Sequence, residues 1–263
     1  MSETIYGIHA IGEALKRGER RFDCVSIAKE RNDPRIQRLI EDCRAKKIAV
    51  RFVEREEIDR VTQVTTHQGV MATTSQKSFT GLEELIDHPR GEHNFLLVLD
   101  GIEDPHNLGA LIRTADGAGV DGVIIPERRA AGITGTVVKS SAGATEYINV
   151  ARVVNIARTV EELKEHNIWT IGLDERGEQS YEEIDYGTMN CAIVMGAEGR
   201  GLHDLVARKC DMLVSIPMMG EVSSLNVSVA GGVVMYEVLR QRRALQKASE
   251  PPAAKPGKKR NKK

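Results

Sequence analysis

Apolar patterns recur through the second half of the chain and predict strands at Phe95–Leu99, Val123–Ile125, Asn149–Val153, Ile168–Leu173, Ile193–Met195 and Met212–Ile216. Phe95–Leu99 is a continuous apolar run, which is typical of a central parallel strand covered on both faces. Helical patterns lie between or after them, over His106–Gly117, Gly135–Ala142, Ala157–His166 and Val227–Leu239. Strands that alternate with helices form parallel sheets covered by helices on both faces. Residues 94–246 therefore predict an α/β domain with a parallel sheet.

The first 75 residues carry shorter patterns and predict a small α/β/α domain. Helices are expected at Gly7–Arg17, Asp33–Lys47 and Arg55–Val61, and strands at Phe22–Ala28, Ile48–Val53 and Gly69–Thr74. Asp33 and Pro34 are a typical cap and first residue of a helix. Residues 76–93 predict a linker, with a short helix at Gly81–Asp87. Residues 247–263 lack apolar anchors and predict a disordered tail.

Charge is distributed unevenly along the chain, although its net value is −1. Residues 1–78 carry 15 basic and 12 acidic side chains, residues 79–246 carry 15 and 25, and residues 247–263 carry 7 and 1. A polyanion would therefore be held mainly by the N-terminal domain and the tail. A basic surface is also commonly just a solvated face, so both interpretations stay open.

Several classes of protein are disfavoured. No early apolar segment indicates secretion, and Val227–Leu239 is too short to span a bilayer. The four cysteines, at positions 24, 43, 191 and 210, show no metal-ligand spacing. We expect free thiols, no metal, and a cytoplasmic protein without membrane contact.

Two loops that follow predicted strands indicate a ligand pocket. Strand Ile193–Met195 runs into Gly196–Gly201, which contains three glycines, and strand Met212–Ile216 runs into Pro217–Gly220. The stretch Ser223–Gly231 then opens the last helix. Ligands bind where the carboxyl ends of parallel strands meet helix N-termini, and glycine lets the backbone approach them closely. Ordinary turns between strands and helices also favour glycine and proline, but two such loops favour a main-chain pocket.

Polar residues near these loops are candidates for chemistry. Asn107 stands at a predicted helix start, where it could simply cap the helix. Arg113 lies among apolar residues, as either a structural ion pair or a functional group directed into a pocket. Neither glycine loop matches G-x-G-x-x-G or G-K-[ST], and H-E-x-x-H and G-x-S-x-G are absent. A dinucleotide or nucleoside-triphosphate site is therefore poorly supported.

Three segments, Asn107–Ala115, Ile193–Leu202 and Ile216–Ala230, resemble in order and spacing the signature motifs of the SPOUT superfamily. Within it they are similar to the SpoU/TrmH family of S-adenosylmethionine-dependent RNA ribose 2′-O-methyltransferases. The third motif is the most specific: Ile-Pro-Met-x-Gly, then Ser-Leu-Asn-Val-Ser-Val-Ala. Residues 1–75 are similar to the ribosomal-protein-like lobe that binds substrate in part of this family.

The resemblance implies a deep trefoil knot in the C-terminal domain, whose loops hold S-adenosylmethionine in a bent conformation. The implied cofactor-binding residues are Gly172, Leu173, Met195, Gly196, Gly201, Ile216, Met218 and Leu225. It also implies a homodimer, to which the helix Val227–Leu239 could contribute. The implied substrate is a guanosine ribose in the peptidyl-transferase region of 23S rRNA, in free RNA or in a large-subunit precursor.

Arg113 is the catalytic residue that the resemblance implies. Because arginine is too basic to lose its proton readily, we expect it to hold the target phosphate or oxygen and to stabilise negative charge. Asn107, Glu198, Ser224 and Asn226 would position Arg113 and the ribose. Glu198 could instead be only a structural partner of Arg113 or Arg200.

Other functions remain as alternatives. The target could be a transfer-RNA guanosine or an rRNA site linked to antibiotic resistance. The chain could also be a non-catalytic RNA-binding ribosome-assembly protein with a vestigial pocket. A nucleotide-dependent oxidoreductase is disfavoured because the dinucleotide fingerprint is missing.

Overall fold

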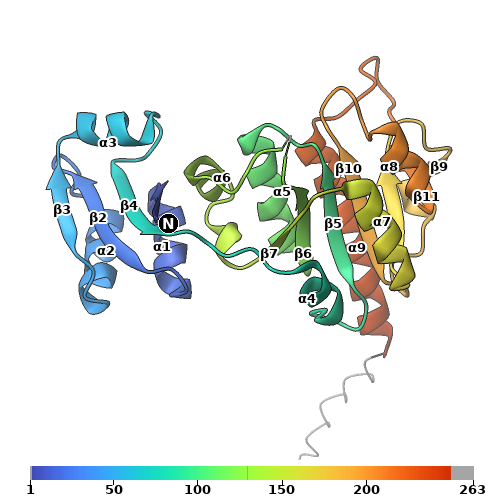
Figure 1. Ribbon diagram of the computed structural model, residues 1–263, viewed down its shortest axis with the longest axis horizontal. Helices are drawn as coiled ribbons and strands as arrows, with labels where there is room; N and C mark the ends of the chain where they lie inside the picture. The colour runs from blue at the N-terminus through green and yellow to red at the C-terminus, as the bar shows by residue number, and fades with distance from the viewer. Residues whose placement is uncertain (1, 129, 250–263) are drawn as a thin grey trace, which may run out of the picture.

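The computed structural model describes residues 2–128 and 130–249 of the 263-residue chain. It contains a small N-terminal sheet and a larger C-terminal sheet, joined by an extended segment and by helix α6 between them (Figure 1). None of the helices in these two ranges is long and apolar enough to cross a lipid bilayer. The same residues contain no group of three potential metal ligands, and all four cysteines are free thiols.

The N-terminal sheet has four strands in the order β1-β4-β2-β3. Its elements are β1 (Ser2–Tyr6), α1 (Ile8–Arg17), β2 (Phe22–Ala28), α2 (Pro34–Ala45), β3 (Val50–Val53), α3 (Arg55–Thr62) and β4 (Val70–Ser75). Strands β2 and β3 are parallel, and the other pairs are antiparallel. Helices α1 and α2 share one apolar cluster with the sheet, and α3 contributes to a second, so the sheet lies between helices.

Helix α2 begins as predicted. The Asp33 side chain accepts a hydrogen bond from the Arg35 amide at 3.1 Å, and Pro34 is the first helical residue. Strand β1 was not predicted from the sequence, because only its last two residues, Ile5 and Tyr6, are buried.

The C-terminal sheet has seven strands in the order β7-β6-β5-β10-β8-β11-β9, and every pair is parallel. The predicted parallel α/β sheet is therefore confirmed. Its elements are α4 (Leu82–Asp87), β5 (Phe95–Asp100), α5 (Pro105–Ala118), β6 (Gly122–Pro126), α6 (Gly135–Ser140), η1 (Ala144–Glu146), β7 (Asn149–Val153), α7 (Ile156–Glu165), β8 (Trp169–Leu173), β9 (Gln179–Ser180), η2 (Tyr181–Glu183), β10 (Cys191–Gly196), α8 (Asp204–Lys209), β11 (Met212–Ser215) and α9 (Val227–Ser249).

Two apolar layers cover this sheet, which explains the continuous apolar runs. In β5, Phe95, Leu97 and Leu99 join the cluster with α5 and α9, whereas Leu96 and Val98 join the cluster with α4, α7 and α8. All six residues of β5 are buried. A strand covered on both faces needs apolar side chains at odd and even positions alike.

Helix α9 extends beyond the predicted end at Leu239 and reaches Ser249. The prediction of disorder is therefore wrong for residues 247–249, and the rest of the predicted tail lies outside the described residues. Ala, Leu, Gln and Lys, which fill this extension, are good helix formers. Arg242 also anchors it, because its guanidinium donates to the carbonyls of His93, Asn94 and Met189 at 2.8–3.0 Å.

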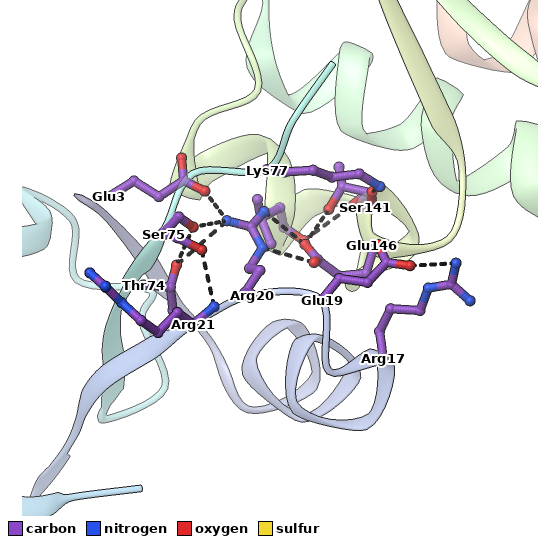
Figure 2. A network of polar contacts seen from close by, with 12 residues as sticks. Glu3, Arg17, Glu19, Arg20, Arg21, Thr74, Ser75, Lys77, Ser141 and Glu146 are labelled. Atoms are coloured by element: carbon purple, nitrogen blue, oxygen red, sulfur yellow. Dashed lines mark hydrogen bonds and ion pairs between the residues drawn. The ribbon is translucent and has the colours of Figure 1, made fainter. Parts of the chain in front are cut away.

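The segment from α6 to η1 joins the two sheets. Val138 of α6 packs in the apolar cluster of the N-terminal domain, and the Tyr6 hydroxyl lies 2.8 Å from Thr136 Oγ1. Figure 2 shows the buried guanidinium of Arg20 against Glu146, with Nε–Oε2 and Nη2–Oε1 distances of 2.8 and 2.9 Å. Along the predicted linker, Thr80 bridges to Ala151 of β7. Contacts on both sides thus fix the N-terminal domain against the larger sheet.

Candidate functional site

A cleft of about 800 Å³ opens at the carboxyl ends of the neighbouring strands β10, β8 and β11. Seven of the eight cofactor positions predicted from the sequence line it: Leu173, Met195, Gly196, Gly201, Ile216, Met218 and Leu225. The eighth, Gly172, is buried and does not line the cleft. A side chain there would point at Leu213 and Leu202, in the apolar layer on the other face of the sheet.

The loop after β10 is a tight turn that depends on glycine. The Gly201 amide donates to the Ala197 carbonyl at 3.0 Å and closes the loop. A Cβ on Gly196 would lie 2.0 Å from the carbonyl carbon of Gly201, so no other residue fits there. Gly199 and Gly201 have φ values of +72° and +65°, which L side chains rarely adopt. The wall of the cleft is therefore close-packed main chain.

Three polar side chains meet at the mouth of the cleft. Glu198 Oε1 accepts hydrogen bonds from Asn107 Nδ2 at 2.6 Å and from Asn226 Nδ2 at 2.8 Å. The same Asn226 nitrogen lies 3.2 Å from Asn107 Oδ1. The three residues come from the first turn of α5, the loop after β10 and the residue before α9. The fold thus brings together one residue from each sequence motif.

The sequence left open a purely structural role for Asn107 and for Glu198, and neither of these alternatives is found at this cluster. Asp104, not Asn107, caps α5, because its side chain accepts the His106 amide at 2.9 Å. Glu198 is no ion-pair partner of Arg113 or Arg200 within residues 2–128 and 130–249, since its hydrogen bonds go to two amides. Asn226 is the capping residue here, for its Oδ1 accepts the Ser228 amide of α9 at 2.9 Å.

Arg113 and Ser224 lie outside the hydrogen-bonded cluster of Asn107, Glu198 and Asn226. Ser224 is exposed and lines the cleft. Arg113 is exposed on α5, does not line the cleft, and makes no ion pair in the described part of the chain. Arg113 lies six positions after Asn107 on α5, a rotation of about 600°, so the two side chains leave the helix in different directions. A single chain therefore does not direct Arg113 into the cleft.

Reasoning from the sequence did not single out two charged residues of the cleft wall, Asp174 and Arg176. Burial disfavours the charged form of Asp174, but hydrogen bonds from Arg176 and from the Leu202 amide outweigh it and hold its pKa below the usual range. A signal was present, because an aspartate directly after a strand and three residues before a glycine is typical of a tight turn.

Comparison with known proteins identifies the family. The SpoU rRNA Methylase family matches residues 94–236, and a domain described as RNA 2′-O ribose methyltransferase substrate binding matches residues 4–80. The chain is 45% identical over 246 residues to the 23S rRNA (guanosine-2′-O-)-methyltransferase RlmB of Pectobacterium atrosepticum, covering 92% of this chain and 99% of that protein. It is 43% identical over 248 residues to RlmB of Escherichia coli, covering 92% and 100%.

A solved structure resembles most of the chain as well. The AdoMet-bound rRNA methyltransferase from Sinorhizobium meliloti superposes with a TM-score of 0.74 at 26% identity, covering 91% of this chain and 87% of that one. The family models together match most of the chain, and the RlmB relatives match nearly their full length. This protein belongs to the SpoU rRNA Methylase family.

Proposed function

We propose that this chain transfers a methyl group from S-adenosylmethionine to the ribose 2′-hydroxyl of a guanosine in 23S rRNA, in the peptidyl-transferase region. The observation that carries the proposal is the glycine-walled cleft with Asn107, Glu198 and Asn226 hydrogen-bonded at its mouth. The RlmB relatives, which span nearly the whole chain, favour this substrate. The methyltransferase bound to AdoMet supports the cofactor.

The residues of the cleft fit this cofactor. Leu173, Ile216 and Leu225 offer apolar surfaces for an adenine ring, and the glycines of the loop after β10 leave main-chain groups accessible. S-adenosylmethionine supplies an electrophilic methyl group on a sulfonium. We assign its binding to the seven predicted residues that line the cleft and to the main chain beside Gly172.

The ribose oxygen bonds to the methyl carbon as the carbon–sulfur bond breaks, so oxygen, methyl and sulfur must lie in line, and the neighbouring RNA phosphate takes up the hydroxyl proton. The Asn107–Glu198–Asn226 cluster positions the ribose at the mouth of the cleft, and Ser224 offers a hydroxyl beside it. Arg113 stabilises negative charge on the attacking oxygen or holds the neighbouring phosphate, since an arginine stays protonated.

A homodimer would supply what one chain leaves incomplete. Arg113 is exposed on α5, and α5 packs against α9, where Val229 and Tyr236 are about half exposed. A second copy seated on this surface would cover the apolar side chains and enclose the Arg113 guanidinium next to a cleft. Contiguous exposed apolar patches on a soluble protein are typical of protein–protein interfaces.

The trefoil knot belongs to the same proposal. Helix α9 packs on α5 and β10, so the chain returns from β11 across the ends of β8 and β10. The segment before β10 lies against the far end of α9, where Gln241 bonds Ile184 and Tyr186. This course supports threading of the last segment through an earlier loop.

The proposed substrate also bears on the cellular location. Because 23S rRNA is part of the ribosome, we assign the enzyme to the cytoplasm.

The N-terminal domain is assigned to RNA binding. Residues 1–78 carry 15 basic and 12 acidic side chains, and several exposed arginines of this domain, including Arg35, Arg38 and Arg51, have no carboxylate within 4.0 Å among the described residues. Unpaired surface cations attract a phosphate backbone without reading its sequence.

The experiment that tests this function maps ribose methylation in total RNA from a deletion strain, its parent, and the deletion strain complemented with the gene. We expect one guanosine of 23S rRNA to lose its 2′-O-methyl group in the deletion strain and to regain it on complementation. A loss confined to transfer RNA would contradict the assigned substrate. An unchanged methylation map would favour a non-catalytic RNA-binding protein.

A further inference from the structure

Asp174, directly after β8, is a buried charge that the proposed chemistry does not use. Its side chain is 2% exposed, so its oxygens scarcely reach the cleft. Hydrogen bonds keep its pKa below the usual range despite burial, and the carboxylate is charged at neutral pH. A buried charge needs compensating partners, and the identity of these partners indicates what the residue does.

The backbone around Asp174 fixes the carboxylate in place. The Asp174 amide donates to the Val214 carbonyl of β11 at 3.0 Å, and the Gly177 amide donates to the Asp174 carbonyl at 3.0 Å. Within this turn, Asp174 Oδ1 accepts the Arg176 amide at 3.0 Å and Arg176 Nε at 2.7 Å. The carboxylate is therefore held rigidly at the end of its strand.

Asp174 Oδ2 and the Arg176 guanidinium together hold the loop that follows β10 by hydrogen bonds to Leu202. Asp174 Oδ2 accepts the Leu202 amide at 3.1 Å, and Arg176 Nη2 donates to the Leu202 carbonyl at 3.0 Å. The next amide, that of His203, donates to Asp100 Oδ2 at 3.0 Å, at the end of β5. Because β5 and β8 flank β10, the loop is anchored from both sides where it returns.

These hydrogen bonds to Leu202 also fix the part of the loop that lines the cleft. The Gly201 carbonyl carbon packs beneath Gly196, and the loop is closed between Ala197 and Gly201, so it moves as one piece with Leu202. Its inner side lines the cleft. Glu198, at its tip, holds Asn107 and Asn226.

We propose that Asp174 is a positioning residue for methyl-donor binding, which holds the Gly196–Leu202 loop in the conformation that receives S-adenosylmethionine. The inference rests on the proposed function, because that function names the ligand of the cleft. Replacing Asp174 with Asn preserves its size but turns one acceptor into a donor. That donor must face either the Leu202 amide or Arg176, which are donors too, so the loop loses an anchor.

The test compares wild type, Asp174→Asn and the control Asp204→Asn. Asp204 also binds Arg176, at 2.8 Å, but its side chain is 75% exposed and makes no hydrogen bond to the main chain of the Gly196–Leu202 loop. We expect Asp174→Asn to raise the calorimetric Kd and the KM for S-adenosylmethionine about 10- to 100-fold, with much smaller changes in kcat and in the KM for RNA. Asp204→Asn should change these constants less than about twofold.

Hydrogen exchange supplies a readout that needs no cofactor. In Asp174→Asn, the amides of residues 197–203 should exchange faster than in wild type or Asp204→Asn, while β5 and α7 stay protected. The inference would be overturned if Asp174→Asn had the same Kd for S-adenosylmethionine and the same amide exchange rates as wild type. A uniform loss of protection with kcat and both KM values worsening together would overturn it as well, because this indicates a merely structural role. If exchange responds but wild type binds no S-adenosylmethionine, the proposed function fails while the anchor remains.

Discussion

Arg113 is the single side chain on which the proposed chemistry depends most. We expect Arg113→Ala to lower kcat about 100- to 1,000-fold, as is typical when a group that stabilises transition-state charge is removed. The Kd for S-adenosylmethionine should stay unchanged, because Arg113 does not line the cleft. Single-turnover methyl transfer and calorimetry measure the two effects. Arg158→Ala, an exposed arginine on α7 at the opposite face of the sheet, is the control.

Gly196 tests the close-packed wall of the cleft. In Gly196→Ala the new Cβ would lie 2.0 Å from the Gly201 carbonyl carbon, so the loop must shift. We expect weaker binding of S-adenosylmethionine and a loss of about 1–3 kcal/mol in the free energy of unfolding. In Gly232→Ala, within α9, the nearest atom is Thr114 Cγ2 at 3.7 Å. That variant should be neutral or gain about 0.5–1 kcal/mol. Equal stability of the two variants in urea would contradict this account.

At the scale of single residues, local sequence revealed only part of the site. Gly196 and Asn226 stood out because glycines and helix starts are readable in the chain. The role of Asp174 could not be predicted from the sequence, because its partner Leu202 lies 28 residues away along the chain. The hydrogen bond from Asn107 to Glu198 was not predicted either, since the two residues lie 91 positions apart.

At the scale of elements, strands buried on both faces were the most predictable. The run Phe95–Leu99 agrees closely with β5, whose six residues are all buried. The elements that escaped prediction were short or half-exposed: β1, the two-residue β9 and the six-residue α8. A pattern of few buried positions does not distinguish a strand or a helix from a loop.

The segment from α6 to η1 lies between the two sheets and packs against the domains on both sides. The sequence did not indicate this contact. The buried Arg20–Glu146 pair is its strongest polar link, with both side chains 2% exposed. We expect Arg20→Met to lower the free energy of unfolding by about 3–5 kcal/mol, because it leaves the Glu146 carboxylate buried without its partner. Arg21→Ala, whose side chain is 81% exposed, should cost less than about 1 kcal/mol. Urea denaturation followed by circular dichroism compares the two.

At the scale of the whole molecule, the same contacts predict one cooperative unit. Val138 and Glu146 come from the larger domain but are buried against the smaller one. Differential scanning calorimetry should therefore show a single transition for wild type. In Arg20→Met the N-terminal domain should melt separately and earlier. Two separate transitions in wild type would contradict a shared core.

The proposed dimer gives a second prediction at this scale. Sedimentation equilibrium at micromolar concentration should show twice the mass of 29.0 kDa, because α9, which packs on α5, carries exposed apolar side chains. Tyr236→Glu, on that face, should shift the protein toward the monomer. A wild type that stays monomeric would contradict completion of the site by a second copy.

Methyl transfer in a purified system tests the central claim most directly. The protein is incubated with labelled S-adenosylmethionine and unmodified 23S rRNA, and the product is digested and mapped by mass spectrometry. We predict one labelled guanosine, methylated on its 2′-hydroxyl, in wild type and almost none in Arg113→Ala. A label on a base, a label spread over many nucleotides, or equal labelling by the variant would contradict the account.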